Sequence, residues 1–234
     1  MIGKIKEFNF KSLLILNTFA LIVTSFFFNN FIFIGVYTFF FFVSLFTTKN
    51  GLKIIKKLNL LQNIRVEGPT NHFKKSDTPT MGGIFMILPF LIFLLIKAIN
   101  LGSLQLILLL LTIFGFFITG FLDDYLSIKN KKNTGLKTRE KFILQSIISI
   151  VFISVAYEKN LINPLIIVSD SWGINMNIFI LPISFLVLVG LSNSVNLTDG
   201  LDGLAAGCSG IVFYGLGTEI LMKEQQELIV LSIL

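Results

Sequence analysis

Four aspartates in two short motifs are the residues of this sequence best suited to chemistry. Asp123 and Asp124 are adjacent, whereas Asp199 and Asp202 lie in a glycine-rich segment. Adjacent carboxylates repel each other unless a cation or a bound substrate offsets their charge. Mg²⁺ is commonly held by one or two carboxylates, with phosphate oxygens and water completing its octahedron. The adjacent pair is therefore a candidate magnesium site, although an isolated Asp-Asp is more often a solvated helix end.

The segment NSVNLTDGLDGLAAG at 193–207 adds amides to these carboxylates. Its polar side chains recur every third residue: Asn193, Asn196, Asp199 and Asp202. This spacing allows them to line one side of a helical or 3₁₀-like turn. Two amides and two carboxylates suit a nucleotide, a sugar hydroxyl or a hydrated metal ion. Small-residue helix packing explains the glycines and alanines that follow, but not the acids.

Hydroxyl, glycine and lysine residues elsewhere could bind phosphate. TPTMGG at 78–83 places Thr80 and two glycines just before a helix expected from residue 84, where free N–H groups would suit an anion. Lys75 lies upstream, and Lys141 ends a basic loop. Lysines there could neutralise a diphosphate or a lipid phosphate, although setting membrane topology accounts for most of them. Carboxylates for Mg²⁺ and lysines for phosphate together predict phosphoryl transfer.

The elements that must position these residues are membrane helices. The 234-residue chain is 54% hydrophobic and only 14% charged, against about one quarter charged in soluble domains. We predict an all-α polytopic membrane protein that forms a single domain over 1–234, with about seven transmembrane helices and the start of another. Helices are expected at 13–28, 31–46, 80–98, 101–122, 142–156, 178–191 and 204–222, with another beginning at 228.

Two shorter segments are predicted between these helices. Segment 52–64 has apolar residues at helical spacing with lysines opposite. It fits either an amphipathic helix on the inner leaflet or an extension of the preceding helix. Apolar stretches 165–168 and 176–180 flank a glycine-containing turn at 169–173 and predict a small periplasmic β-hairpin.

The charge distribution indicates which side of the membrane the motifs face. Of 19 lysines and arginines, seven lie in 49–75 and six in 129–141, and such loops face the cytoplasm by the positive-inside rule. Two predicted helices separate the loop at 47–79 from that at 123–141, and two more separate this loop from 192–203. All three motifs are therefore expected to meet in one cytoplasmic-face site.

Single residues exclude other kinds of site. One cysteine, Cys208, excludes an intrachain disulfide, and one histidine, His72, excludes a histidine-based metal site or a Ser-His triad. The chain ends inside an apolar run at 229–234, where a free carboxylate would be costly in hydrocarbon. We therefore expect the chain to be the N-terminal part of a longer protein.

Four motifs together resemble the phospho-N-acetylmuramoyl-pentapeptide transferases, a branch of the polyprenyl-phosphate N-acetylhexosamine-1-phosphate transferases. They are TPTMGG at 78–83, GFLDDY at 120–125, NTGLKTREKFILQ at 133–145 and NSVNLTDGLDGLAAG at 193–207. The motifs follow the family's order and spacing. DD and DGLDGLA mark the superfamily, whereas TPTMGG close behind HFKK is more specific to the peptidoglycan branch.

The resemblance implies an enzyme of the bacterial plasma (inner) membrane in peptidoglycan synthesis. Its reaction would transfer phospho-N-acetylmuramoyl-pentapeptide from UDP-N-acetylmuramoyl-pentapeptide to undecaprenyl phosphate, giving lipid I and UMP with Mg²⁺ as cofactor. The resemblance also implies a homodimer surrounded by membrane lipid, with no nucleic-acid partner.

The resemblance assigns roles to matching positions. Asp123 and Asp124 would be catalytic and metal-binding residues at the reacting phosphates, with Asp123 as the candidate to activate the lipid phosphate. The resemblance places Lys75, Thr80, Asn193, Asp199 and Asp202 in the substrate site. Lys141, from its charge, and Asn196, from the spacing of the polar residues, are further substrate-binding candidates. A further metal-binding aspartate and a histidine-rich loop of the family would fall beyond Leu234. Ser127 and Asp77 replace the lysine and glycine of many members, which are milder departures.

Three alternatives remain open at this point. A sister enzyme that makes undecaprenyl-linked N-acetylglucosamine would share the acidic motifs, but TPTMGG disfavours it. A secondary transporter would place its carboxylates near the bilayer midplane, whereas these acids follow apolar spans on one face. An inactive fragment of a transferase is the third alternative, which the abrupt C-terminus favours.

Overall fold

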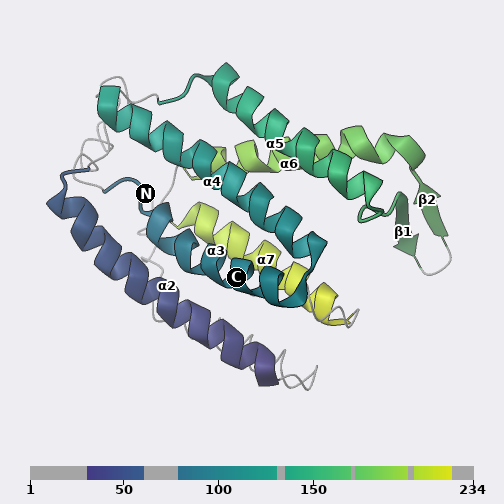
Figure 1. The fold of residues 1–234 in the computed structure, drawn as a ribbon, viewed down its shortest axis with the longest axis horizontal. Helices are drawn as coiled ribbons and strands as arrows, with labels where there is room; N and C mark the ends of the chain where they lie inside the picture. The colour runs from purple at the N-terminus through teal and green to yellow at the C-terminus, as the bar shows by residue number, and fades with distance from the viewer. Residues whose placement is uncertain (1–30, 61–78, 131–134, 170–171, 200–202, 223–234) are drawn as a thin grey trace, which may run out of the picture. The chain divides into compact units, whose positions relative to one another are not determined.

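The computed structural model describes residues 31–60, 79–130, 135–169, 172–199 and 203–222 (Figure 1). These residues are mostly α-helical and include one two-stranded sheet. The chain divides into two compact units. Ser44–Gly200 forms one, here named the central unit, and Met1–Val43 with Leu201–Leu234 forms the other. The candidate carboxylate pair lies in the central unit.

Four helices of the central unit are long and apolar enough to cross a membrane. They are α3 (Gly83–Leu101), α4 (Leu104–Asn130), α5 (Thr138–Glu158) and α6 (Ile180–Thr198), the last preceded by the 3₁₀ turn η2 (Asn177–Phe179). Contacts join α3 to α4, α4 to α5 and α5 to α6 (Figure 1). The protein is therefore a multi-pass membrane protein. The expected helix at 13–28 and the one from 228 lie outside the described residues, so the total of seven crossings stays a prediction.

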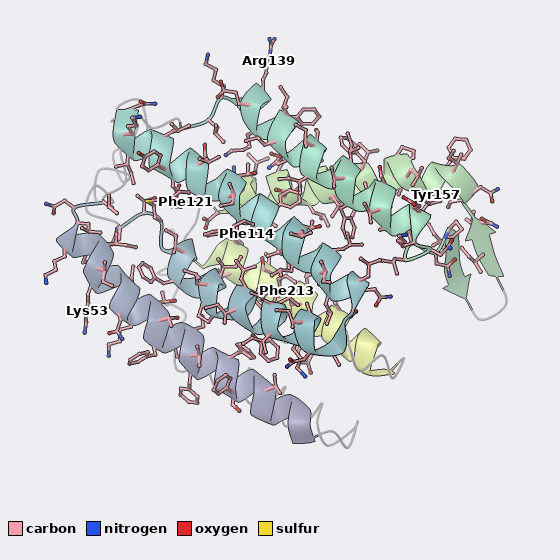
Figure 2. All side chains as sticks on the ribbon, viewed as in Figure 1. Lys53, Phe114, Phe121, Arg139, Tyr157 and Phe213 are labelled. Atoms are coloured by element: carbon pink, nitrogen blue, oxygen red, sulfur yellow. The ribbon has the colours of Figure 1, made fainter. Side chains whose placement is uncertain are left out.

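These helices expose large apolar side chains where they face lipid and bury small side chains where they contact each other. Large apolar side chains such as Ile150 on α5 and Leu186 on α6 are exposed, as expected for surfaces that face hydrocarbon. The buried positions of α5 include small residues, with Ser149 fully buried and Ala156 only 1% exposed. Small residues let helix backbones approach closely in membranes. On α4, rings including Phe114 and Phe121 form a stripe along the helix (Figure 2).

Short connections make neighbouring helices antiparallel. Between α3 and α4, Gly102 adopts a left-handed conformation (φ 58°) and its N–H bonds to the Ile99 carbonyl, which ends α3 and reverses the chain. Since α4 and α5 are also joined by a short segment, the C-terminal ends of α4 and α6 lie with the N-terminal ends of α3 and α5. This end of the central unit, here named the site end, holds the carboxylate pair.

The predicted hairpin is present at the opposite end, with a different second strand. Strand β1 (Leu165–Ser169) pairs antiparallel with β2 (Trp172–Asn175), with Leu165 opposite Asn175 (Figure 1). The prediction of a strand at 176–180 is wrong, because these residues enter η2 and α6. The Asn175 side chain accepts the Asn177 N–H at 3.0 Å, and Asn177 is left-handed (φ 46°), so the strand stops there. Its periplasmic location stays a prediction.

The first described helix is longer than predicted. α2 (Phe31–Lys57) continues eleven residues past the expected end at residue 46, as an extension rather than a separate surface helix. It stops before Asn59, which is left-handed (φ 52°). Gly51 lies so close to the Phe85 ring that a Cβ would overlap it, so this part of α2 packs on the start of α3. Lys53 points away from α2 (Figure 2). In the other unit, α7 (Leu204–Met222) has the predicted bounds.

Candidate functional site

The carboxylate pair lies within α4 rather than at its end. The sequence predicts a helix that stops at residue 122, but α4 continues to Asn130 because neither glycine nor proline interrupts 121–130. Consecutive residues of an α-helix point about 100° apart. Asp123 and Asp124 therefore face different neighbours, although they are adjacent in sequence.

Asp123 is held by the start of α5. Its Oδ2 lies 2.6 Å from the Lys141 Nζ, and its Oδ1 accepts the Leu136 N–H at 2.9 Å. The side chains of this ion pair are only 20% and 26% exposed for Lys141 and Asp123 respectively. Partial burial lowers the effective dielectric and strengthens the attraction. Both carboxylate oxygens of Asp123 thus have a donor from one segment, 136–141.

Two local features place that segment. The Lys137 N–H donates to the Glu140 carboxylate at 2.8 Å, which satisfies one free donor at the N-terminus of α5. Gly135 lies directly against the Asp123 main chain, where an added Cβ would overlap the Asp123 carbonyl oxygen. Only a residue without a side chain fits there. Sequence reasoning missed Gly135 and Leu136, although the N-T-G at 133–135 is a recognisable turn signal.

Asp124 is held by the residues that precede α3. Its Oδ2 accepts the Met81 N–H at 3.2 Å, and the Thr80 hydroxyl also hydrogen bonds to it. Met81 is 9% exposed and left-handed (φ 65°), a conformation that costs a non-glycine residue roughly 1–2 kcal/mol. The bond to Asp124 helps to hold this backbone. The predicted anion site before α3 is therefore occupied by a carboxylate of the protein itself.

A buried amide network connects α5 to α6 one turn further along. Gln145 is 4% exposed. Its Nε2 donates to the Ser192 Oγ at 3.0 Å, and its Oε1 accepts from the Asn193 Nδ2 at 2.9 Å. Sequence reasoning did not single out Gln145, although a glutamine in an apolar membrane helix is a usable signal.

The remaining candidates on α6 are differently placed. The predicted end at 191 is wrong, because α6 continues to Thr198 with polar side chains bonded to its own carbonyls, as Thr198 Oγ1 is to the Ser194 oxygen at 2.8 Å. Asn196 is exposed, and Asp199 caps the helix as an exposed residue. Asn193 is part-buried, so the three differ in their exposure to solvent, and the prediction that they line one side of a substrate site stays a prediction. Lys75 and Asp202 lie outside the described residues.

The structure thus brings together four of the predicted site residues. At the site end Asp123 forms an ion pair with Lys141, and the neighbouring Asp124 is hydrogen bonded to Thr80. Arg139, which also belongs to the basic loop, is exposed and points away from α4 (Figure 2). The acidic and basic side chains therefore form a specific cluster and not a general charged surface.

Adjacent carboxylates suit a hard divalent cation. In the part of the chain that the structure describes, no group of three or more acidic, histidine or cysteine side chains could enclose a metal ion. Mg²⁺ needs only one or two carboxylates when phosphate and water supply the other ligands. Asp123 and Asp124 fit this requirement by donor type, and Asp124 pairs with no cation among the described residues.

Comparison with known proteins agrees with the motifs. Residues 106–234, over half of the chain, match the model of glycosyl transferase family 4. Residues 75–87 match signature 1 of the phospho-N-acetylmuramoyl-pentapeptide-transferases. The signature contains Thr80 and Met81, which hold Asp124, and the family match contains the segment that holds Asp123.

Similar proteins carry the same name as the signature. A phospho-N-acetylmuramoyl-pentapeptide-transferase of Prochlorococcus marinus (strain MIT 9312) is 85% identical over all 234 residues, which cover 65% of that relative. One of Halalkalibacterium halodurans is 40% identical over 164 residues, 69% of this chain and 50% of the relative. This chain thus spans 65% of the length of its Prochlorococcus relative. The chain belongs to glycosyl transferase family 4 and carries the phospho-N-acetylmuramoyl-pentapeptide-transferase signature.

Proposed function

We propose that this chain carries the catalytic carboxylates of a phospho-N-acetylmuramoyl-pentapeptide transferase. The reaction would join UDP-N-acetylmuramoyl-pentapeptide to undecaprenyl phosphate, giving lipid I and UMP. The observation that carries the proposal is the cluster at the site end. There the signature segment holds Asp124, and the start of α5 holds Asp123 beside Lys141.

The bond changes of this reaction are a phosphoryl transfer. An oxygen of undecaprenyl phosphate forms a bond to the β-phosphorus of the nucleotide sugar, and the bond from that phosphorus to the bridging oxygen breaks. UMP leaves with the bridging oxygen and the electron pair. The lipid phosphate is already largely ionised at neutral pH, so the protein chiefly has to position it and neutralise charge.

The residues of the cluster suit these tasks. Lys141 lies 2.6 Å from Asp123 and is positioned to neutralise a phosphate that approaches this carboxylate. Asp123 and Asp124 would hold Mg²⁺, which when bound offsets charge on the phosphate oxygens. Asp123 would also orient the attacking lipid phosphate. Asn193 and, beyond the described residues, Lys75 and Asp202 are proposed contacts of the nucleotide sugar, together with Asn196 and Asp199 at the end of α6.

Charge supports a location of the site at the cytoplasmic face of the plasma membrane. Exposed lysines at the end of α2 include Lys53 and Lys57, and Lys129 and Arg139 flank the α4–α5 connection. Because Gly51 packs against Phe85, the end of α2 lies near the start of α3 at the site end. Basic segments of this kind stay in the cytoplasm. The homodimer implied by the resemblance stays a prediction.

The proposal is tested with the purified chain in detergent and added lipid. The assay measures UMP release and the lipid-linked product from UDP-N-acetylmuramoyl-pentapeptide, with undecaprenyl phosphate and Mg²⁺. We expect both products, and loss of both in Asp123→Asn. Parallel reactions contain UDP-N-acetylglucosamine, because turnover of that substrate alone would favour the sister enzyme. Because the chain spans 65% of its Prochlorococcus relative, a second reaction supplies the remaining C-terminal segment of that relative; absence of both products from folded wild-type chain in both reactions would contradict the proposal.

A further inference from the structure

The amide of Asn193 has an orientation that its neighbours determine. Its Nδ2 lies 2.8 Å from the main-chain oxygen of Val189, one turn earlier on α6. A main-chain carbonyl can only accept a hydrogen bond. The atom of Asn193 that faces Val189 must therefore be the nitrogen, even though side-chain amide nitrogen and oxygen are otherwise hard to distinguish.

This orientation fixes the direction of the other bonds. The Asn193 nitrogen also faces Gln145 at 2.9 Å, so Gln145 must present its oxygen there. The Gln145 nitrogen then points to the Ser192 hydroxyl, 3.0 Å away, which accepts. Each of these three hydrogen bonds thus has one donor and one acceptor. Reversal of either amide would bring two acceptors or two donors together.

Both N–H groups of the Asn193 side chain donate hydrogen bonds within this network, and its Oδ1 takes no part in them. One N–H bonds to Val189 and the other to Gln145. Among the described residues, no donor reaches the Asn193 Oδ1. The Asn193 side chain is only part-buried, at the site end of α6. An amide oxygen accepts from N–H and O–H groups and repels phosphate oxygens.

We propose that Gln145 is a positioning residue that makes Asn193 present an acceptor to the nucleotide-sugar substrate. This inference rests on the proposed function. The substrate group at Asn193 is an N–H or O–H donor, such as an imide or a hydroxyl, and not a phosphate oxygen. Gln145 itself does not touch the substrate. It acts by keeping the Asn193 amide from rotating.

A purely structural role for Gln145 makes different predictions. A single hydrogen bond between membrane helices contributes only slightly to stability, so its loss lowers stability slightly and does not weaken the binding of one substrate selectively. If Gln145 is a positioning residue, its substitution instead weakens the binding of the nucleotide sugar and leaves the binding of undecaprenyl phosphate unchanged. In a variant in which Asn193 has already lost its amide, substitution of Gln145 should then cause no further loss of affinity for the nucleotide sugar.

The experiment compares Gln145→Met and Gln145→Glu by two measurements, the Kd for UDP-N-acetylmuramoyl-pentapeptide by calorimetry and the KM for each substrate. Gln145→Met keeps the length of the side chain but removes both bonds. We expect its Kd to rise about tenfold, as for the loss of one substrate hydrogen bond, with KM for undecaprenyl phosphate unchanged. Burial favours the protonated form of a glutamic acid. Its carbonyl and O–H reproduce the glutamine pattern, so Gln145→Glu should restore binding.

The matched control and the double variant complete the test. Ser146 is the next residue of α5, and its buried hydroxyl has no partner among the described residues, so Ser146→Ala should leave both constants unchanged. Asn193→Ala should raise the Kd as much as Gln145→Met does. The double variant should raise it no further. An additive loss in the double variant would reduce Gln145 to a structural residue and overturn the inference.

Other outcomes separate this inference from the proposed function. If wild-type chain neither binds the nucleotide sugar nor releases UMP, the proposed function fails first. If wild-type chain binds and Gln145→Met binds equally well, only the inference fails. Should Gln145→Met not fold, Asn193→Asp decides, because an aspartate oxygen would face the Val189 carbonyl and the acceptor would be misplaced. Wild-type affinity in Asn193→Asp would overturn the inference.

Discussion

Asp123 and Asp124 are neighbours in sequence, but the protein treats them differently. Asp123 is bound by an ammonium group and a main-chain N–H, both from the segment that begins α5. Asp124 is bound only by neutral donors, from the segment that precedes α3. The charge of Asp123 is therefore offset inside the protein, whereas that of Asp124 is left for a cation or substrate. The rotation of about 100° between consecutive helix residues therefore gives these two identical side chains different partners.

The largest expected effects come from removing each charge separately. We expect Asp123→Asn and Asp124→Asn each to lower kcat about 1,000-fold, the size of effect seen when one preorganised electrostatic group is lost at a transition state. Their dependence on Mg²⁺ should differ. Asp124→Asn should need more Mg²⁺ for half-maximal rate, whereas Asp123→Asn should stay slow at every concentration. Equal Mg²⁺ curves for the two variants would remove the distinction.

Removal of the Lys141 ammonium group tests the same difference between Asp123 and Asp124. Lys141→Met leaves Asp123 without its ion-pair partner in a partly buried place, which is costly for a carboxylate. We expect kcat to fall about 100-fold, or about 2.7 kcal/mol in transition-state stabilisation. Lys141→Arg keeps the charge on a planar group of different reach and should recover part of the rate. The measurement is UMP release at saturating concentrations of both substrates.

The sequence predicts which residues make up this cluster, but not which partners bind Asp123 and which bind Asp124. The apolar spans, the acidic pair and Lys141 follow from residue types, and the number of predicted helices between the loops places the three motifs on one side of the membrane. The two partners of the carboxylates that come from the main chain, Met81 and Leu136, cannot be predicted in this way, because any residue supplies an N–H. Only the observed backbone shows where those groups point.

The helix ends show a second limit of sequence reasoning. Hydropathy falls at residue 122 and again at residue 191, and the hydrophobic pattern alone predicts a helix end at both positions. Helix formation depends instead on backbone bonds and the absence of breakers, so α4 and α6 continue through polar residues to Asn130 and Thr198. The hydrophobic pattern therefore locates the membrane crossing, while the site is built on the polar extensions that follow it.

A smaller change tests how closely the α4–α5 connection must approach Asp123. In Gly135→Ala the added methyl group would overlap the Asp123 carbonyl oxygen, so the connection must shift and carry the Leu136 N–H with it. We expect kcat to fall about 30-fold, since displacements near 1 Å at reacting groups can cost about 100-fold. Gly120→Ala on α4, the helix that carries Asp123, is the matched control, because nothing lies within 4 Å of the position of an added Cβ there. Equal rates for the two variants would mean that the connection is flexible.

The smallest expected effect comes from the cap of α5, which acts on Asp123 only through Leu136 and Lys141. Glu140→Ala removes the acceptor of the Lys137 N–H, and lost caps of this kind cost about 1 kcal/mol of local stability. Because the segment still contains both donors to Asp123, kcat should fall only about threefold, by about 0.7 kcal/mol. Glu140→Gln keeps an acceptor oxygen and should match the wild type. A large loss in both variants would instead show that the Glu140 charge itself matters, since its exposed carboxylate would then contribute to the field at Asp123 and not merely to the start of the helix.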